Sequence, residues 1–229
     1  MTKLFAFGII VQMKKSLVAI LLSICLALPL VGCGAVGGRT VHNPDDDVIA
    51  RLSVFATDER GHVAPALAAA GHAYVCIENL SGVDMILGKG YVLPADNAVT
   101  IASWEMDAHS GIWYNIEPTY KARGWYDERK SVTRDVDEAS LKRINAFLTN
   151  DDNDYWTLFH NCVHFAVGLW NEAARGSGDD IDISGKLTPA DLIAKMKEFD
   201  EFEVARPYES DLPTGYFAGN AFKEFKLAE

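Results

Sequence analysis

The sequence predicts an α+β fold in which an antiparallel sheet packs against helices. Three observations support this class. Several runs within residues 48–117 alternate apolar and polar side chains with period two, as half-buried strands do. Turn-forming clusters such as Asn79-Leu80-Ser81-Gly82 separate these runs. Residues 137–199 then change to the spacing of amphipathic helices. Strands that precede helices in this way indicate helices segregated against an antiparallel sheet.

The first 33 residues have the pattern of a secretory signal. Met13–Cys33 combines a short basic start, an apolar run and small residues before a cysteine. Leu30-Val31-Gly32-Cys33 resembles the lipobox of bacterial lipoproteins. This resemblance implies that Cys33 carries lipid and anchors the protein to a membrane of the bacterial cell envelope, facing the periplasm. Met13 is then the expected true start. A simple transmembrane anchor is the alternative interpretation.

Charge and composition indicate one globular domain without nucleic acid as a partner. The chain has 229 residues, of which 49% are hydrophobic, and a net charge of −11. Residues 1–33 contain three lysines and no acid, so their removal leaves 18 basic against 32 acidic groups, a net −14. No basic patch appears. Residues 34–47 are expected to form a flexible tether and residues 48–229 a single domain, whose oligomeric state the sequence does not indicate.

The predicted strands come first along the domain. Five segments show strand-like alternation or apolar content, and the second and third are expected to form a hairpin. They are Val48–Ala56, Gly71–Asn79, Val83–Leu87, Ala98–Trp104 and Gly111–Glu117. Residues 120–130, rich in charge and aromatics, are expected to form a loop over the sheet.

Three helices follow. Asp137 can cap a helix with an apolar stripe that ends near Asn150. Asn161 can cap a second helix that starts at Cys162. Thr188, followed by a first-turn proline, starts a third that is expected to reach Phe199. A last strand is expected at 202–206, before a tail packed by aromatic side chains.

Cys162 is the strongest candidate nucleophile. The first turn of a helix favours a negative charge, and there a thiolate forms most easily. His164 lies about 200° around the helix axis, so it cannot readily serve this thiol as a base. His72 on the Gly71–Asn79 strand is the expected base, with Tyr74 on the same strand face as a candidate binding residue. The alternative for Cys162 is a buried structural thiol.

Two other uses of the cysteines compete with catalysis. Cys76 and Cys162 remain once the leader is gone, and in an oxidising compartment they could form a disulfide. If His72 faces Cys162, however, Cys76 lies four residues along the strand, about 13 Å away, which is too far for that bond.

A metal site is the other alternative, since the types of side chain that bind metals occur at His160, Cys162 and His164. Residues two positions apart point away from each other on a helix, so no metal is expected. His160 is instead expected to make polar contacts near the Cys162 turn.

The histidine in GHAYVCIEN, followed about ninety residues later by NCVHFAVGLW, resembles the circularly permuted papain-like hydrolases of the NlpC-type superfamily. Asn161-Cys162-x-His164-Phe165 is similar to the box of their lecithin retinol acyltransferase-like branch. The resemblance implies a permuted papain-like architecture over roughly residues 48–200, no cofactor, Cys162 as nucleophile and His72 as base. It also implies a third polar group that orients the histidine, for which Asp84 and His109 are the candidates. Asn161, His160 and Tyr74 are the expected binding residues.

Three functions are compatible with these residues. The first is a lipid-anchored periplasmic cysteine peptidase or amidase that acts on peptides, including those of peptidoglycan. The second is an acyltransferase or lipid thioesterase of the same fold. The third is a non-enzymatic envelope lipoprotein that uses the fold as a binding module.

Overall fold

The computed structural model describes residues 47–58, 71–123, 129–185, 188–204 and 210–226. All of them belong to a compact unit of residues 38–229. The predictions for the signal peptide, the start at Met13 and lipidated Cys33 lie outside the described residues, as does nearly all of the expected tether. Within the described ranges, no helix is long and apolar enough to span a membrane.

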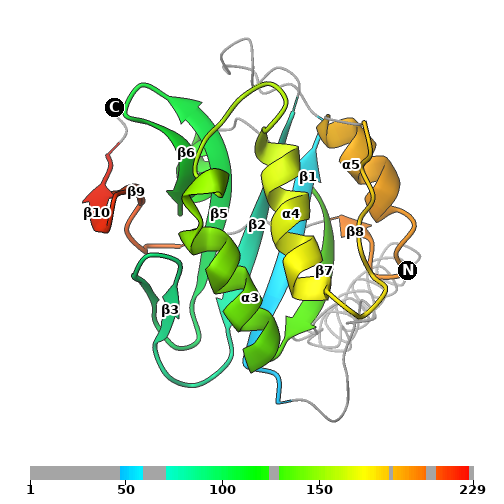
Figure 1. Cartoon of the computed structure of the whole chain (residues 1–229), viewed down its shortest axis with the longest axis horizontal. Coiled ribbons are helices and arrows are strands. Elements are labelled where there is room, and N and C mark those ends of the chain that lie inside the picture. Colours follow the sequence, from blue (N-terminus) through cyan, green and yellow to red (C-terminus); the bar gives the residue numbers. More distant parts are fainter. Residues whose placement is uncertain (1–46, 59–70, 124–128, 186–187, 205–209, 227–229) are drawn as a thin grey trace, which may run out of the picture. The chain divides into compact units, whose positions relative to one another are not determined.

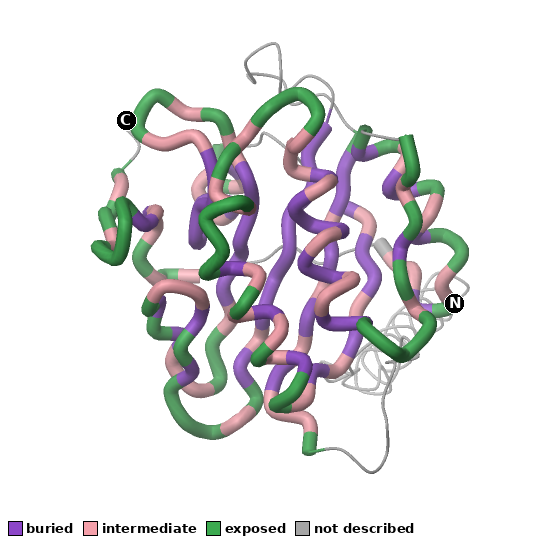
Figure 2. Tube along the Cα trace, in the orientation of Figure 1, coloured by how far each residue is buried: buried purple, intermediate pink, exposed green. Residues whose placement is uncertain are grey.

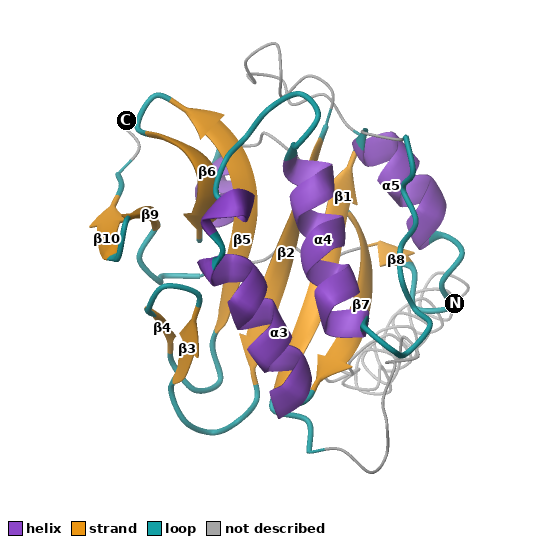
Figure 3. Ribbon diagram, in the orientation of Figure 1, coloured by secondary structure: helices purple, strands orange, loops and turns teal. Residues whose placement is uncertain are grey.

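The described domain is a mixed α and β fold built on a large antiparallel sheet, as predicted (Figure 3). The sheet has eight strands in the order β10-β9-β6-β5-β2-β1-β7-β8. These strands are β1 (Ala50–Thr57), β2 (His72–Asn79), β5 (Ala98–Met106), β6 (His109–Tyr114), β7 (Lys130–Val136), β8 (Glu203–Val204), β9 (Gly215–Ala218) and β10 (Ala221–Glu224). Each neighbouring pair runs antiparallel.

Helices α3 (Glu138–Thr149) and α4 (Cys162–Ala174) lie across one face of the sheet, beside α5 (Pro189–Met196) (Figure 1). Their starts follow the predicted caps. The Asp137 carboxylate accepts a hydrogen bond from the Ser140 N–H, which satisfies an orphan donor of α3. At α5, Thr188 and Asp191 form a reciprocal capping box. α5 ends at Met196, three residues before the predicted end, because the chain turns there through hydrogen bonds from Glu198 and Phe199.

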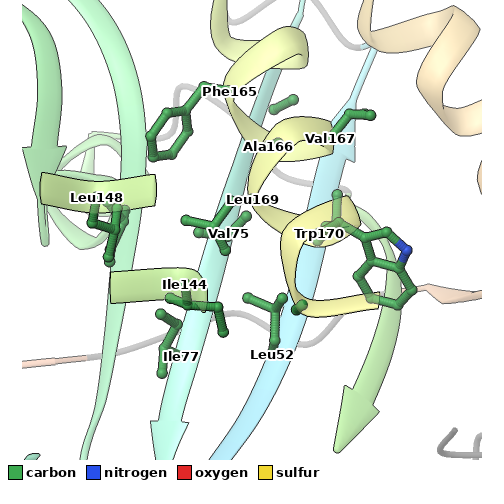
Figure 4. Close-up of a cluster of buried hydrophobic side chains, with 14 of the residues drawn as sticks. Leu52, Val75, Ile77, Ile144, Leu148, Phe165, Ala166, Val167, Leu169 and Trp170 are labelled. Carbon is green, nitrogen blue, oxygen red and sulfur yellow. The ribbon is translucent and has the colours of Figure 1, made fainter. Parts of the chain in front are cut away.

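The main hydrophobic core lies between these helices and the central strands (Figure 4). Alternate residues of β1 and β2, among them Leu52, Val75 and Ile77, point toward α3 and α4 and have no exposed surface. Leu169 of α4 is equally buried against them. Burying a side chain of this size contributes about 2 kcal/mol. The tube in Figure 2 is accordingly buried along β1, β2 and the sheet side of α4.

The expected hairpin of Gly71–Asn79 with Val83–Leu87 is wrong. β2 pairs with β1 and β5, whereas β3 (Met85–Leu87) pairs with β4 (Tyr91–Leu93) in a separate two-stranded sheet. The side chain of Asn79 explains the departure. Its buried amide donates to the Val83 and Leu93 carbonyls, so it holds the chain in a tight turn that leads away from the large sheet.

The expected loop at 120–130 and the expected tail both contain regular structure. A short helix, α2 (Glu117–Ala122), begins at the end of the expected Gly111–Glu117 strand, with proline in its first turn. Residues 124–128 lie outside the described residues, and β7 begins at Lys130. The aromatic tail forms the β9–β10 hairpin, and the expected strand at 202–206 is reduced to β8 within the described residues.

Candidate active site

Cys162 is the first residue of α4, as predicted. Asn161 has extended backbone angles, and its side-chain oxygen accepts hydrogen bonds from the N–H groups of Val163 (3.0 Å) and His164 (3.4 Å). Within the described part of the chain, no acceptor is bonded to the Cys162 N–H. The helix start therefore presents a half-buried thiol together with an unused backbone donor.

His72, the first residue of β2, meets this thiol. Its side chain is hydrogen-bonded to that of Cys162. On the other side, its Nε2 lies 2.9 Å from Oε1 of Glu117, the first residue of α2. Because Glu117 occupies Nε2, Nδ1 is the ring nitrogen left to exchange a proton with the thiol. His72 and Glu117 are only 2% and 1% exposed, so their interaction is shielded from water.

The charges around His72 favour its protonated form. Burial alone lowers the pKa of His72, but the Glu117 carboxylate and then Cys162 raise it by more, from 6.5 to about 9. An imidazole with this pKa holds a proton at neutral pH. At neutral pH the Cys162 thiol therefore lies beside a positively charged ring.

Trp104 on β5 supports both members of the His72–Glu117 pair. Its indole ring lies 4.0 Å from the His72 ring, centroid to centroid. Its Nε1–H donates to Glu117 Oε1 at 2.9 Å, the same oxygen that faces His72. Tyr120 also packs against the indole, with ring centroids 4.8 Å apart. The histidine and the carboxylate are thus held by packing as well as by hydrogen bonds.

The sheet register explains why His72 and Trp104 meet although they are far apart in sequence. Val75 of β2 faces Ile101 of β5, so three residues away along each strand His72 comes opposite Trp104. The register of β6 does not bring Glu117 there, because Trp104 pairs with Gly111 and the strand then runs away from it. Glu117 comes instead from α2, where its carboxylate accepts from the Trp104 indole, at the end of the sheet where α4 starts.

Neither sequence candidate for the third polar group is bonded to His72. Asp84 is exposed in the turn that precedes β3. His109 begins β6, where its Nε2 lies 2.9 Å from Asp154 Oδ1 and its ring stacks on Tyr216. Among the described residues, Glu117 is the carboxylate that holds the histidine.

The alternatives of a disulfide and of a metal site receive no support from the described residues. Cys76 and Cys162 are both free thiols. Burial raises the pKa of the Cys76 thiol, and Glu78 raises it further, so this cysteine is held protonated. Within the described ranges, no group of three or more candidate ligands could hold a metal ion.

The loop before α4 brings two expected binding residues and an exposed apolar pair near the thiol. The His160 ring stacks on Tyr155 with centroids 4.2 Å apart. Burial, followed by the charge of His164, lowers the pKa of His160, so it is neutral near pH 7. Leu158 and Phe159 are 63% and 77% exposed, which is high for large apolar side chains. Tyr74, by contrast, is buried in the sheet between Phe55 and His72.

Sequence reasoning missed Glu117 and Trp104. Glu117 gave no signal, because the alternating run of Ile112, Tyr114 and Ile116 puts residue 117 on the opposite, polar face. Trp104 gave none either, since its role depends on the strand that lies beside it.

Comparison with known protein families, with curated proteins and with solved structures finds no match to this chain.

Proposed function

We propose that the chain is a thiol hydrolase in which Cys162 is the nucleophile, His72 the general base and Glu117 the group that orients His72. The observation that carries this proposal is the continuous hydrogen-bonded series from Cys162 through His72 to Glu117. A nucleophile, its base and a third group that fixes the base form the constellation expected for covalent catalysis.

The proposed reaction is hydrolysis of an amide through a thioacyl intermediate. In the resting enzyme the proton of Cys162 Sγ has already passed to His72, and the thiolate of this pair forms a bond to the acyl carbon while the Cys162 N–H donates to the developing oxyanion. The protonated His72 gives its proton to the departing amine as the C–N bond breaks. Water, deprotonated by His72, then attacks the thioester, the C–S bond breaks, and the acid leaves as the thiol regains its proton.

Sequence and topology together favour a circularly permuted papain-like arrangement for this site. The histidine strand precedes the cysteine helix in the chain, which is the order that the resemblance to NlpC-type hydrolases implies. With a lipid at Cys33, the enzyme would face the periplasm from a membrane of the cell envelope. We infer that its substrates are peptides or amides of that compartment, with peptidoglycan peptides as the first class to test.

The first test is alkylation of the reduced full-length protein in detergent micelles with iodoacetamide from pH 5 to 9. Mass spectrometry would measure labelling of Cys162 and Cys76 separately. We expect rapid labelling of Cys162 that persists below pH 7, and slow labelling of buried Cys76 in the same sample. His72→Ala and Glu117→Gln should each slow Cys162 labelling, because they remove the base and its partner.

His109→Ala is the matched control. His109 also lies 2.9 Å from a carboxylate oxygen, but that carboxylate belongs to Asp154 and not to the site. Its removal should leave the rate of Cys162 labelling unchanged. Equal labelling in the wild type, His72→Ala and Glu117→Gln would overturn the proposed function and favour a binding module. If labelling follows the expectation, cleavage of peptidoglycan peptides by wild type but not by Cys162→Ala would identify the substrate.

An acyltransferase or lipid thioesterase is the second candidate, and one observation favours it. The exposed apolar side chains of Leu158 and Phe159 come four and three residues before the thiol, where they could contact an acyl chain. Incubation with a lipid thioester and an amine separates the two functions. Release of fatty acid or formation of an acylated amine, lost in a Leu158→Ser and Phe159→Ser double variant, would support the second candidate over the first.

A further inference from the structure

Arg129 is a buried cation that the proposed mechanism does not use. It directly precedes β7, is 3% exposed, and its guanidinium lies 5.6 Å from the centre of the Tyr74 ring. Its Nε and Nη2 atoms are both buried, and neither has a hydrogen-bond partner in the part of the chain that the structure describes. A buried charged donor without an acceptor is costly, so a group in this state calls for an explanation.

The two unpartnered nitrogens are significant because of the shape of a guanidinium. The N–H groups of Nε and Nη2 point the same way along one edge, and this edge can hold both oxygens of a carboxylate at once. Arg134 is a useful comparison within the described residues. Its Nε and Nη1 are also buried without a hydrogen-bond partner, but its Nη2 donates to Ser177, and Asp179 and Asp137 are among its charged neighbours.

The Tyr74 hydroxyl adds a second donor to this place. It is buried and has no hydrogen-bond partner. The Tyr74 ring also contacts the candidate site, since its centroid lies 6.0 Å from that of His72. The Tyr74 ring thus contacts both the guanidinium of Arg129 and the proposed base, and Tyr74 and Arg129 together hold three buried donor atoms without acceptors among the described residues.

The register of the sheet fixes how far Arg129 lies from the proposed chemistry. Thr57 of β1 pairs with His72, and Ala56 pairs with Lys130, so Arg129 comes level with Thr57 on the far side of β1. Arg129 and His72 are therefore two strand spacings apart, about 10 Å. An extended peptide covers this distance with about three residues.

We propose that Arg129 and Tyr74 bind a carboxylate of the substrate. This inference depends on the proposed function and narrows its substrate class to peptides that carry a free carboxylate within about three residues of the bond that is cut. The carboxylate accepts from Nε and Nη2 of Arg129 and from the Tyr74 hydroxyl, which satisfies donors that are otherwise buried without partners.

Calorimetry on the full-length Cys162→Ala protein in detergent micelles tests this binding without any chemical step. The probes are N-acetyl-diglycine with a free carboxylate and the same peptide as its carboxamide. We expect the carboxylate peptide to bind at least about tenfold more tightly than the carboxamide, because charge-assisted hydrogen bonds are stronger than neutral ones. Arg129→Met should abolish this difference in affinity. Arg129→Lys keeps the charge but not the two parallel N–H donors, so it should retain only part of the difference.

Arg51→Met is the control for loss of an arginine from the sheet. Arg51 lies on β1 and is already paired with Glu78 at 3.1 Å, so its removal should leave the preference intact. Tyr74→Phe removes only the hydroxyl and should reduce the preference by several fold, which keeps the proposal testable if Arg129→Met does not fold. Equal affinity for the acid and the amide in the parent protein would overturn the inference. Failure of the proposed function appears separately, as an unreactive Cys162 in the alkylation assay.

Discussion

Replacement of Glu117 by glutamine should change how the stability of the protein depends on pH. The carboxylate of Glu117 is the largest of the influences that raise the pKa of His72, ahead of Cys162. Glutamine keeps the size of the side chain and an oxygen for the hydrogen bond but removes the negative charge. Burial, which lowers the pKa of His72, then acts with little opposition.

The size and sign of the effect follow from linkage. The pKa of His72 is about 9 in the folded protein against 6.5 for an ordinary histidine. A group whose folded pKa is raised contributes stability that is complete below the unfolded pKa and is lost as the pH rises through the folded pKa. The shift of His72 therefore corresponds to about 3 kcal/mol, present near pH 6 and lost between roughly pH 6.5 and 9.

Urea unfolding of the reduced protein at intervals from pH 6 to pH 9.5 measures this contribution. The wild type should lose stability across that window, Cys162→Ala should lose less, and Glu117→Gln should lose least, because it removes the larger influence. The comparison uses differences between proteins, so ionisation of groups elsewhere cancels. Parallel curves for the wild type and Glu117→Gln would refute the assignment of a charged His72–Glu117 pair.

Three further changes test the supports of the site. Trp104→Phe keeps an aromatic ring but removes the donor to Glu117 Oε1, so it should lower the free energy of unfolding by about 2 kcal/mol in urea titrations. Asn161→Ala should cost about 1 kcal/mol and Asn161→Ser should restore most of it, since serine also caps helices, as thermal unfolding would show. Asp154→Asn removes the partner of His109 and should lower stability at pH 7 while iodoacetamide labelling of the candidate thiol stays as in wild type.

The local features of the domain were predictable because they depend on neighbouring residues. Asn161 as a cap, Cys162 in the first turn and the strand that carries His72 follow from short-range rules, and the structure has all three. The cap at Thr188 also follows from a short-range rule, and the structure has it as a capping box. A cap or an alternating strand is set by residues within a few positions, so one sequence is sufficient to find it.

Features that depend on strand order were not predictable. The sequence suggested that β2 would pair with the next apolar segment, but Asn79 turns the chain out of the sheet and β5 takes that place. The pairing of β2 with β5 decides which residues approach His72. Trp104 belongs to β5 itself, and Glu117 then comes with Trp104. Asp84, one of the two candidates named with the family resemblance, lies in an exposed turn. The residue that orients the histidine depends on strand order, which short-range rules do not predict.

The two faces of the central strands have different physical roles, and this difference supports the location of function. On the helix side, Val75 and its neighbours are buried with apolar partners, which stabilises the fold. On the other side, the same strand buries His72 and Tyr74, and the nearby Arg129 is buried as well, although polar groups are costly there. Among the described residues, Arg129 and Tyr74 bury donors that lack acceptors on this side. In the binding that we propose, a substrate carboxylate supplies these acceptors, and for this reason we place the substrate on this side of the strands.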